Sequence, residues 1–324
     1  MELLTYLSSL SIPNLFSRMP AAAAQGIIWG IMALGVYITF RLLNVSDLTV
    51  DGSFATGGAV TVMLLLRGLP AWAALLLAVA VGILTGLCTG LLHTKFGIPA
   101  ILAGILTQFA LYSINLRIMG KANQTASIKN FGMFWETNGK GFLMSSLYVP
   151  QALIAGLLLS AALVALLYWY FGTEQGSAMR ATGANPAMSR AQGINVSNMK
   201  LLGLALSNGL VALAGGLMTQ FQGTADVSMG RGAIVIGLAA IIIGEVLCDA
   251  IFRKGCNFAV RLLFVVFGGV YYAVMVLILW LKLDPNDLKL FTALIVAIFL
   301  AVPYLREQRR SSFARSAKGG SRHA

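Results

Sequence analysis

Charged side chains are scarce in this sequence. They make up 10% of its 324 residues, whereas 58% of the residues are hydrophobic and the mean hydropathy is +0.83. A water-soluble domain carries about 25% charged residues, because its surface must interact with water. The composition therefore excludes a soluble enzyme or binding module and indicates an integral membrane protein.

Motifs for metals, nucleotides and catalysis are also missing. Cys88, Cys248 and Cys256 lie far apart without CxxC spacing, and His93 and His323 are the only histidines, so no disulfide framework or metal site is expected. No GxxxxGK[ST] phosphate loop occurs, so we expect no ATP binding of that kind in this chain. Its acids are dispersed rather than paired, which argues against a membrane enzyme. We expect no catalytic residue, no metal and no cofactor in the chain itself.

Positive charge gathers at the C-terminal end. The net charge is +12, and Glu307 is the single acid after Tyr304. The basic residues of this segment are Arg306, Arg309, Arg310, Arg315, Lys318 and Arg322. Basic segments beside membrane spans lie on the cytoplasmic side. Residues 305–324 are therefore expected to form a cytoplasmic tail next to membrane lipid, not a surface for nucleic acid.

Apolar segments long enough to cross a membrane follow one another along the chain. They predict an all-α polytopic membrane protein with about nine spans, its N-terminus outside and its C-terminus in the cytoplasm; ten spans are the alternative. The expected spans are 21–43, a second that starts within 44–60, 70–92, 98–116, 149–171, 201–221, 233–247, 259–281 and 287–304. The loop 120–147 then lies outside.

The chain is expected to have three parts. Residues 1–20 predict an amphipathic helix on the outer surface, broken at Pro13. A transmembrane domain covers 21–304, with halves 21–172 and 201–304, and the basic tail 305–324 follows. No cleavable signal peptide is expected, since the first residues lack a basic start and a long apolar run. Gly82, Gly86 and Gly90, four residues apart, predict a strip for close helix packing, with gating as the alternative.

Two glycine-rich polar stretches interrupt the apolar pattern. SDLTVDGSFATGGAV (46–60) contains two acids at membrane depth, where such residues occur only if protein or a water-filled cavity surrounds them. ADVSMGRGAIVIGLAA (225–240) occupies the corresponding place after the sixth span, and the two pairs are expected to run oppositely, as inverted repeats. Interrupted segments at corresponding places of two halves indicate a transport pathway. The residues predicted to border it are Asp47, Asp51, Ser53, Gly57, Gly58, Gly230, Gly232 and Glu245.

Structural roles for these residues stay open as alternatives. Asp47 and Asp51 are as well suited to cap the second span from the aqueous side. Glu245 is expected to pair with Arg253 or Lys254 rather than to contact a solute. Arg231 is expected either to anchor its loop at the membrane interface or to contact a binding protein.

A long polar loop, residues 173–200, separates the two halves, is expected to lie in the cytoplasm and is called the central loop below. It predicts two short helices. The first, over 176–182, is expected to end at Gly183, because glycine adopts the left-handed conformation without steric cost. The second is expected to be capped by Asn185, to have Pro186 in its first turn and to end at Gly193. With the basic residues Arg180 and Arg190, this gives a compact knob, the alternative being a solvated connector.

Four segments, in this order, resemble the permease subunits of bacterial ABC importers. They are SDLTVDGSFATGGAV (46–60), ALYSINLRIMGKAN (110–123), MRATGANPAMSRAQGINV (179–196) and MGRGAIVIGLAAIIIGE (229–245). The resemblance is strongest to the tryptophan/tyrosine-type branch, which is related to ribose and branched-chain amino-acid permeases. It implies a type II importer-like fold in a multi-pass protein of the bacterial inner membrane, beginning at the second helix of longer ten-helix relatives.

The resemblance also implies partners. In that family the loop matching 179–196 docks into a separate ATPase subunit, and that subunit binds ATP and Mg²⁺. The other partners are an extracytoplasmic solute-binding protein and a second copy of the permease. The coupling residues implied here are Arg180, Gly183, Asn185, Pro186, Arg190 and Gly193. The expected cargo is a small polar solute, with an amino acid such as tryptophan or tyrosine as a candidate. The alternative function is a secondary transporter driven by an ion gradient through Asp47, Asp51 or Glu245.

Overall fold

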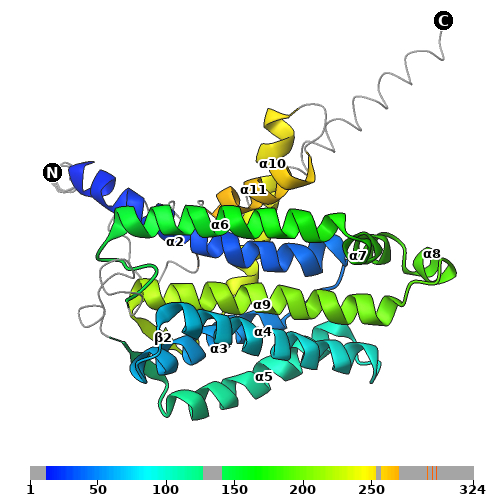
Figure 1. The fold of residues 1–324 in the computed structure, drawn as a ribbon, viewed down its shortest axis with the longest axis horizontal. Helices are drawn as coiled ribbons and strands as arrows, with labels where there is room; N and C mark the ends of the chain where they lie inside the picture. Colours follow the sequence, from blue (N-terminus) through cyan, green and yellow to red (C-terminus); the bar gives the residue numbers. More distant parts are fainter. Residues whose placement is uncertain are drawn as a thin grey trace, which may run out of the picture.

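The computed structural model describes residues 12–126, 141–252 and 257–269, together with residues 290, 294 and 297. Its elements, shown in Figure 1, are α2 (Ile12–Tyr37), the π-helix η1 (Ile38–Leu42), α3 (Thr49–Leu66), α4 (Ala71–Thr94), α5 (Ala100–Met119), β1 (Asn123–Thr125), α6 (Val149–Gly172), α7 (Glu174–Ala184), α8 (Pro186–Ala191), α9 (Val196–Gln222), β2 (Thr224–Asp226), α10 (Ala233–Ile251) and α11 (Phe258–Gly268).

The predicted all-α membrane architecture is confirmed in outline. Six described helices are long and apolar enough to cross a membrane: α2 with η1 from Met19 onward, α3, α4, α5, α6 and α9. The predicted seventh span is a helix, α10, and α11 begins where the eighth was expected. Of the predicted ninth span only residues 290, 294 and 297 are described, and the basic tail lies outside the described segments, so the number of nine and the inverted repeats stay predictions. No helix boundary occurs at residue 20, because α2 runs from Ile12 through Pro20.

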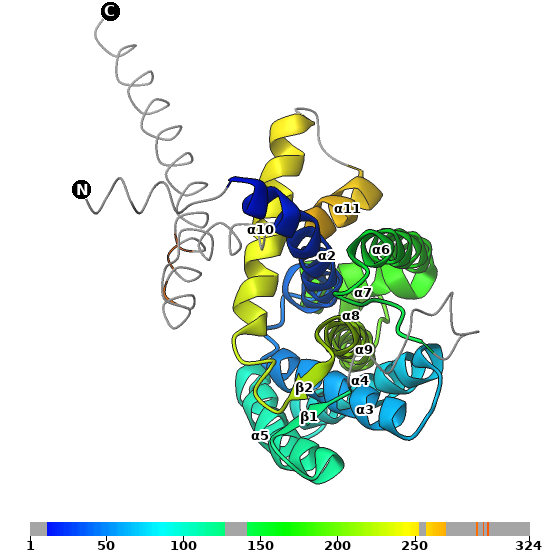
Figure 2. The same cartoon turned by 90° about the vertical axis from the view of Figure 1, so that its left-hand side faces the viewer.

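Three helices form the interior of the bundle. In the most apolar stretch of α2 and of α9, 83% of the residues are buried, and in α3 72%, against 28–39% for α4, α5 and α6. Figure 2 looks nearly along these long helices and shows α9 among its neighbours, whereas α10 is seen from the side and so crosses the bundle steeply. The outer faces of α4 and α6 carry exposed leucines and aromatics, and α5 carries exposed leucines, as helices against lipid do.

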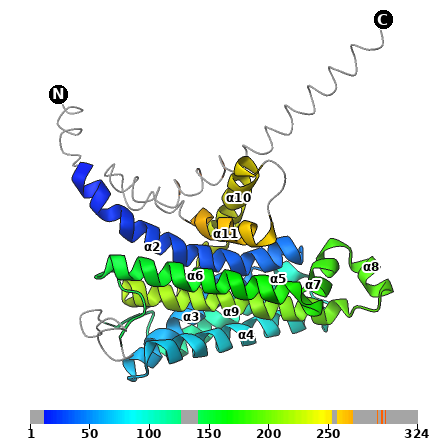
Figure 3. The same cartoon turned by 45° about the horizontal axis from the view of Figure 1, so that its top comes forward.

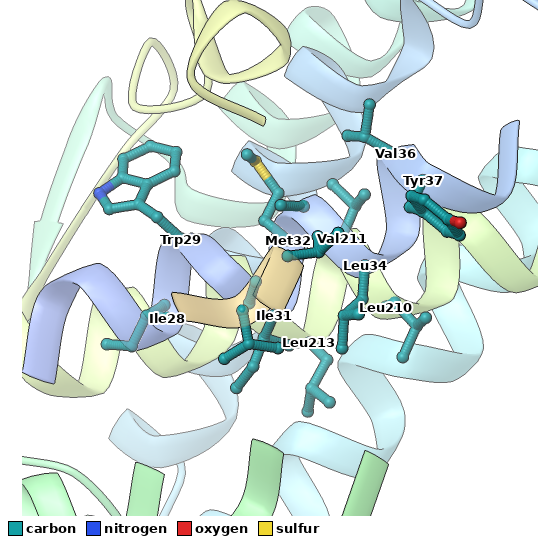
Figure 4. Packing of buried hydrophobic residues seen from close by; sticks show 14 of the residues in the cluster. Ile28, Trp29, Ile31, Met32, Leu34, Val36, Tyr37, Leu210, Val211 and Leu213 are labelled. Atoms are coloured by element: carbon teal, nitrogen blue, oxygen red, sulfur yellow. The ribbon is translucent and has the colours of Figure 1, made fainter. Parts of the chain in front are cut away.

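Large apolar side chains hold α2 to α9. Figure 4 shows Ile31 and Leu34 of α2 next to Leu210 and Leu213 of α9, all buried. Trp29 of α2 stacks on Phe54 of α3, with ring centroids 5.0 Å apart and planes 5° from parallel. These contacts fix α2, α3 and α9 as one packed unit.

The glycine strip of α4 packs against α9, as predicted. A Cβ atom on Gly86 would lie 2.8 Å from the carbonyl carbon of Leu204, and one on Gly90 would lie 2.7 Å from a methyl carbon of Leu201. At Gly86 the overlap is with backbone, so only glycine lets the two helices approach this closely there, whereas at Gly90 the Leu201 side chain could move aside.

The loops divide between the two ends of the bundle. At one end, β1 after α5 pairs antiparallel with β2 after α9, with Gln124 opposite Ala225. Figure 3 shows α7 and α8 of the central loop projecting from the other end. The two ends of the molecule are thus a short sheet and a helical knob.

We predict that Gly86→Ala destabilises the protein by about 1–3 kcal/mol, because the new methyl group overlaps the Leu204 backbone and forces α4 away from α9. The measurement is thermal unfolding in detergent. Gly172→Ala is the matched control, since a Cβ atom there meets nothing within 4 Å. Equal melting temperatures for the two variants would contradict the packing argument.

Candidate translocation and coupling sites

Asp47 lies in the irregular segment between η1 and α3 and is buried, with 3% of its surface exposed. One carboxylate oxygen accepts a hydrogen bond from the Thr49 backbone N–H at 2.9 Å. The other accepts from the side-chain amide of Asn208 on α9 at 2.8 Å. Asp47 therefore accepts the first backbone N–H of α3 from a buried position, not from the aqueous side as the structural alternative expected, and also ties that start to α9.

Hydroxyl groups extend this contact across four helices. The Ser53 hydroxyl donates to the Asn208 side-chain oxygen at 2.7 Å and lies 2.8 Å from the Thr85 hydroxyl of α4. The Thr89 hydroxyl lies 2.7 Å from that of Thr49. It also donates to the Thr107 hydroxyl of α5 at 3.0 Å. The polar network defined here consists of Asp47, Thr49, Ser53, Thr85, Thr89, Thr107 and Asn208. All seven side chains are buried.

Asp51, in the first turn of α3, holds the start of α10. Its two carboxylate oxygens accept the backbone N–H groups of Gly232 and Ile234, each at 3.0 Å. Gly230 lies directly against the Asp51 carbonyl group and has no room for a side chain. Three of the predicted pathway residues, Asp51, Gly230 and Gly232, thus meet at one place, and Asp51 caps α10 rather than its own helix.

The other predicted pathway residues lie elsewhere. Gly57 is pressed against the Ala212 backbone of α9, and a Cβ atom on Gly58 would lie 2.6 Å from the Thr219 hydroxyl. Both glycines are buried, and so is Ser53 in the polar network. Their positions serve the packing of α3 on α9, and a role along the pathway stays a prediction.

Glu245 of α10 pairs with Arg41 of η1, with Nε and Oε1 2.9 Å apart. Its expected partners, Arg253 and Lys254, lie outside the described residues. Sequence reasoning missed Arg41 because 204 positions separate the pair and neither residue has a local signal for the other. The ion pair joins the end of α2 to the middle of α10.

The central loop contains two short helices, as predicted. The Asn185 side-chain oxygen accepts from the backbone N–H groups of Ala187 and Met188, each at 3.1 Å, and Pro186 occupies the first turn of α8. Gly193 follows α8 with a φ of 81°, a conformation that suits glycine. The predicted end of the first helix is wrong, because α7 continues through Gly183 to Ala184.

Gly183 has a different role, namely contact with η1. A Cβ atom there would overlap the Leu42 carbonyl group, so α7 lies backbone against backbone on the π-helix. Arg180 of α7 lies over the ring of Phe258 on α11, 5.6 Å from its centroid. The inner side of α7 is therefore fixed to the membrane domain at two points.

The tip of the central loop is open. Arg190 is exposed and forms no ion pair or hydrogen bond of its guanidinium within the described segments. Met188 beside it is 62% exposed. The tip thus offers an apolar and a cationic group to a partner.

No group of three or more His, Cys, Asp or Glu that could hold a metal ion occurs in the described residues.

We predict that Asn208→Ala costs on the order of 3 kcal/mol of folding free energy, because it leaves the buried Asp47 carboxylate without its amide donor. Thermal unfolding in detergent measures the loss. Asn198→Ala, at an exposed position on the same helix, should leave the melting temperature nearly unchanged. A loss no larger than that of the control would show that Asp47 does not depend on Asn208.

Comparison with known proteins agrees with this architecture. A family model described as the branched-chain amino acid transport system / permease component matches residues 19–303. The tyrosine transport system permease protein of Clostridioides difficile is 38% identical over 281 residues, covering 86% of this chain and 88% of that protein. No solved structure matches the chain.

More distant relatives are similar over shorter stretches. The probable branched-chain amino acid transport permease protein LivH of Methanocaldococcus jannaschii is 29% identical, covering 59% of this chain and 62% of that protein. The ribose import permease protein RbsC of Escherichia coli is 28% identical, covering 63% of this chain and 60% of that protein. The chain belongs to the branched-chain amino acid transport permease family, the membrane-embedded permease components of ABC transport systems.

Proposed function

We propose that this chain is the permease subunit of a binding-protein-dependent importer of the bacterial inner membrane, and that a separate ATPase subunit drives it. The observation that carries the proposal is the central loop, a capped helical knob with an open tip and a fixed base. The partners are the ATPase, an extracytoplasmic solute-binding protein and a second copy of this chain. ATP and Mg²⁺ belong to the ATPase subunit.

A continuous set of contacts leads from the knob into the membrane domain. Gly183 of α7 lies against Leu42 of η1, and Arg41 of η1 pairs with Glu245 of α10. The start of α10 is held in turn by Asp51 of α3. Movement of the knob on the cytoplasmic side is thereby transmitted to the contact between Asp51 and the start of α10, where the two interrupted segments meet.

The ion-gradient alternative has less support. Asp47, Asp51 and Glu245 each accept hydrogen bonds from different groups within the protein, and each carboxylate has a structural task. An acid that carries protons or sodium must release its partners during each cycle. Membership of the permease family favours ATP as the energy source instead.

The proposed cargo is a small polar solute, and an amino acid such as tyrosine or tryptophan is the first candidate. The support comes from the similarity to the tyrosine transport system permease protein. The translocation route is proposed to run beside Asp51, Gly230 and Gly232, and the sheet end of the bundle is proposed to face outward.

Uptake by reconstituted vesicles tests the energy source. Vesicles containing the permease and the ATPase, with the binding protein outside, are expected to accumulate the ligand of that binding protein only when ATP is enclosed. The ligand is identified beforehand by a rise in the melting temperature of the purified binding protein. Uptake abolished by a protonophore while ATP is retained would overturn the proposal.

We predict that Arg190→Glu disrupts the ATPase contact, since a repulsive charge in a partly desolvated interface costs on the order of several kcal/mol. Co-purification of a tagged ATPase and ligand-stimulated hydrolysis should both fall by about tenfold or more. Arg67→Glu is the matched control, because Arg67 is exposed at the C-terminal end of α3. Wild-type binding and hydrolysis in Arg190→Glu would show that the knob is only a connector.

A further inference from the structure

A pocket of about 90 Å³ lies between α3, α5 and the turn that follows β2. Asp51 and Arg231 give it charged groups, Asn115 gives an amide, and Phe109 and Tyr112 give aromatic rings. It is smaller than a whole solute of drug size and suits one polar end of a molecule. Of these residues, Asp51 alone was a predicted pathway residue.

Asn115 has no hydrogen-bond partner in this pocket. Its side chain is 1% exposed, and neither its amide nitrogen nor its amide oxygen has a partner among the described residues. A buried amide that loses water without gaining protein partners destabilises the fold. Such a group in a native pocket indicates a ligand that supplies both an acceptor and a donor.

The pocket also presents two separate charges of opposite sign. The Arg231 guanidinium lies over the Tyr112 ring, 6.0 Å from its centroid, and within the described segments it forms no ion pair with Asp51. The Asp51 carboxylate accepts the backbone N–H groups of Gly232 and Ile234, one on each oxygen, and a carboxylate has about four acceptor sites in all. The pocket therefore complements a ligand with adjacent positive and negative groups.

The charged groups of the pocket argue against lipid as its neighbour. Asn115 lies about three quarters of the way along the apolar helix α5, at ~1.5 Å per residue from Ala100, and Asp51 lies opposite Gly230 at the start of α10. Charged groups at membrane depth occur only where protein or water surrounds them. We infer that this face of α5 borders the proposed translocation route.

We propose that this pocket binds the charged end of an α-amino acid on its way through the permease. The ligand carboxylate accepts from Arg231 and from the Asn115 amide nitrogen, and the ligand ammonium group donates to Asp51 and to the Asn115 amide oxygen. Phe109 and Tyr112 pack against the ligand side chain. Asp51 repels a ligand that carries only a negative charge, and Arg231 repels one that carries only a positive charge. A zwitterion therefore fits the pocket best. The assignment rests on the proposed transport function.

Saturation-transfer NMR on the full chain in lipid nanodiscs measures this binding, because the method detects weak complexes. The probe is L-phenylalanine, compared with phenethylamine, which lacks the carboxylate, with 3-phenylpropionate, which lacks the amine, and with D-ribose. L-phenylalanine is expected to bind, and each truncated analogue about tenfold more weakly, as the loss of one charge-assisted contact predicts. Equal signals for the three aromatic compounds, or no signal for L-phenylalanine, would overturn the proposal.

Two variants locate the signal in the pocket. Arg231→Gln and Asn115→Leu should each weaken L-phenylalanine binding about tenfold or more. Asn115→Leu should also keep or raise the melting temperature of the protein, since it removes unpartnered polar atoms. If Asn115 had a structural role instead, the same substitution would lower the melting temperature. Arg67→Gln, at an exposed position on α3, is the control and should bind as the wild type does. Unchanged binding in both pocket variants would place the ligand elsewhere.

The two proposals fail in distinguishable ways. ATP-dependent uptake by the complete transporter tests the function without reference to the pocket. Uptake that proceeds while Arg231→Gln and Asn115→Leu bind L-phenylalanine normally removes the pocket and leaves the function. Pocket-dependent binding without ATP-dependent uptake removes the function and leaves an amino-acid site.

Discussion

A buried carboxylate inside the membrane domain sets the arrangement of the helices around it. Asp47 is buried at the start of α3, and a charge at that depth is stable only with hydrogen-bond donors. Asn208 supplies one donor from α9, and the Ser53 hydroxyl holds the same amide from α3. These contacts fix the register between α3 and α9. The glycine strip of α4 then lets the α4 backbone pack closely on these two helices.

The same constraint explains why irregular backbone is tolerated here. Lipid could not satisfy the free peptide groups of the segment between η1 and α3. The Leu43 and Val45 backbone N–H groups donate to carbonyl groups of η1 instead, and the Thr49 N–H group donates to the Asp47 side chain. The second interruption, before α10, depends on the first, because Asp51 caps α10 across the interface. The second interrupted segment is therefore incomplete without Asp51 of the first.

Local features of the sequence were predictable and long-range partners were not. Hydropathy located the long helices, and the caps at Asn185 and Pro186 follow from residues two or three positions apart. The partners of Glu245 and Asp51 come from other helices, so no local pattern indicates them. Gly183 shows what local sequence cannot predict, because a glycine can either end a helix or permit close packing. Only its contact with Leu42 in the folded protein identifies packing as its role.

Coupling between the knob and the pocket requires rigidity more than strong contacts. The Arg41–Glu245 pair is half exposed on the arginine side, and exposed pairs contribute little stability. The Gly183 contact is steric, because α7 cannot move toward η1 without displacing the Leu42 carbonyl group. Under the proposed function, a push of the ATPase on the knob reaches η1 through this backbone contact, and the ion pair keeps α10 in register with η1.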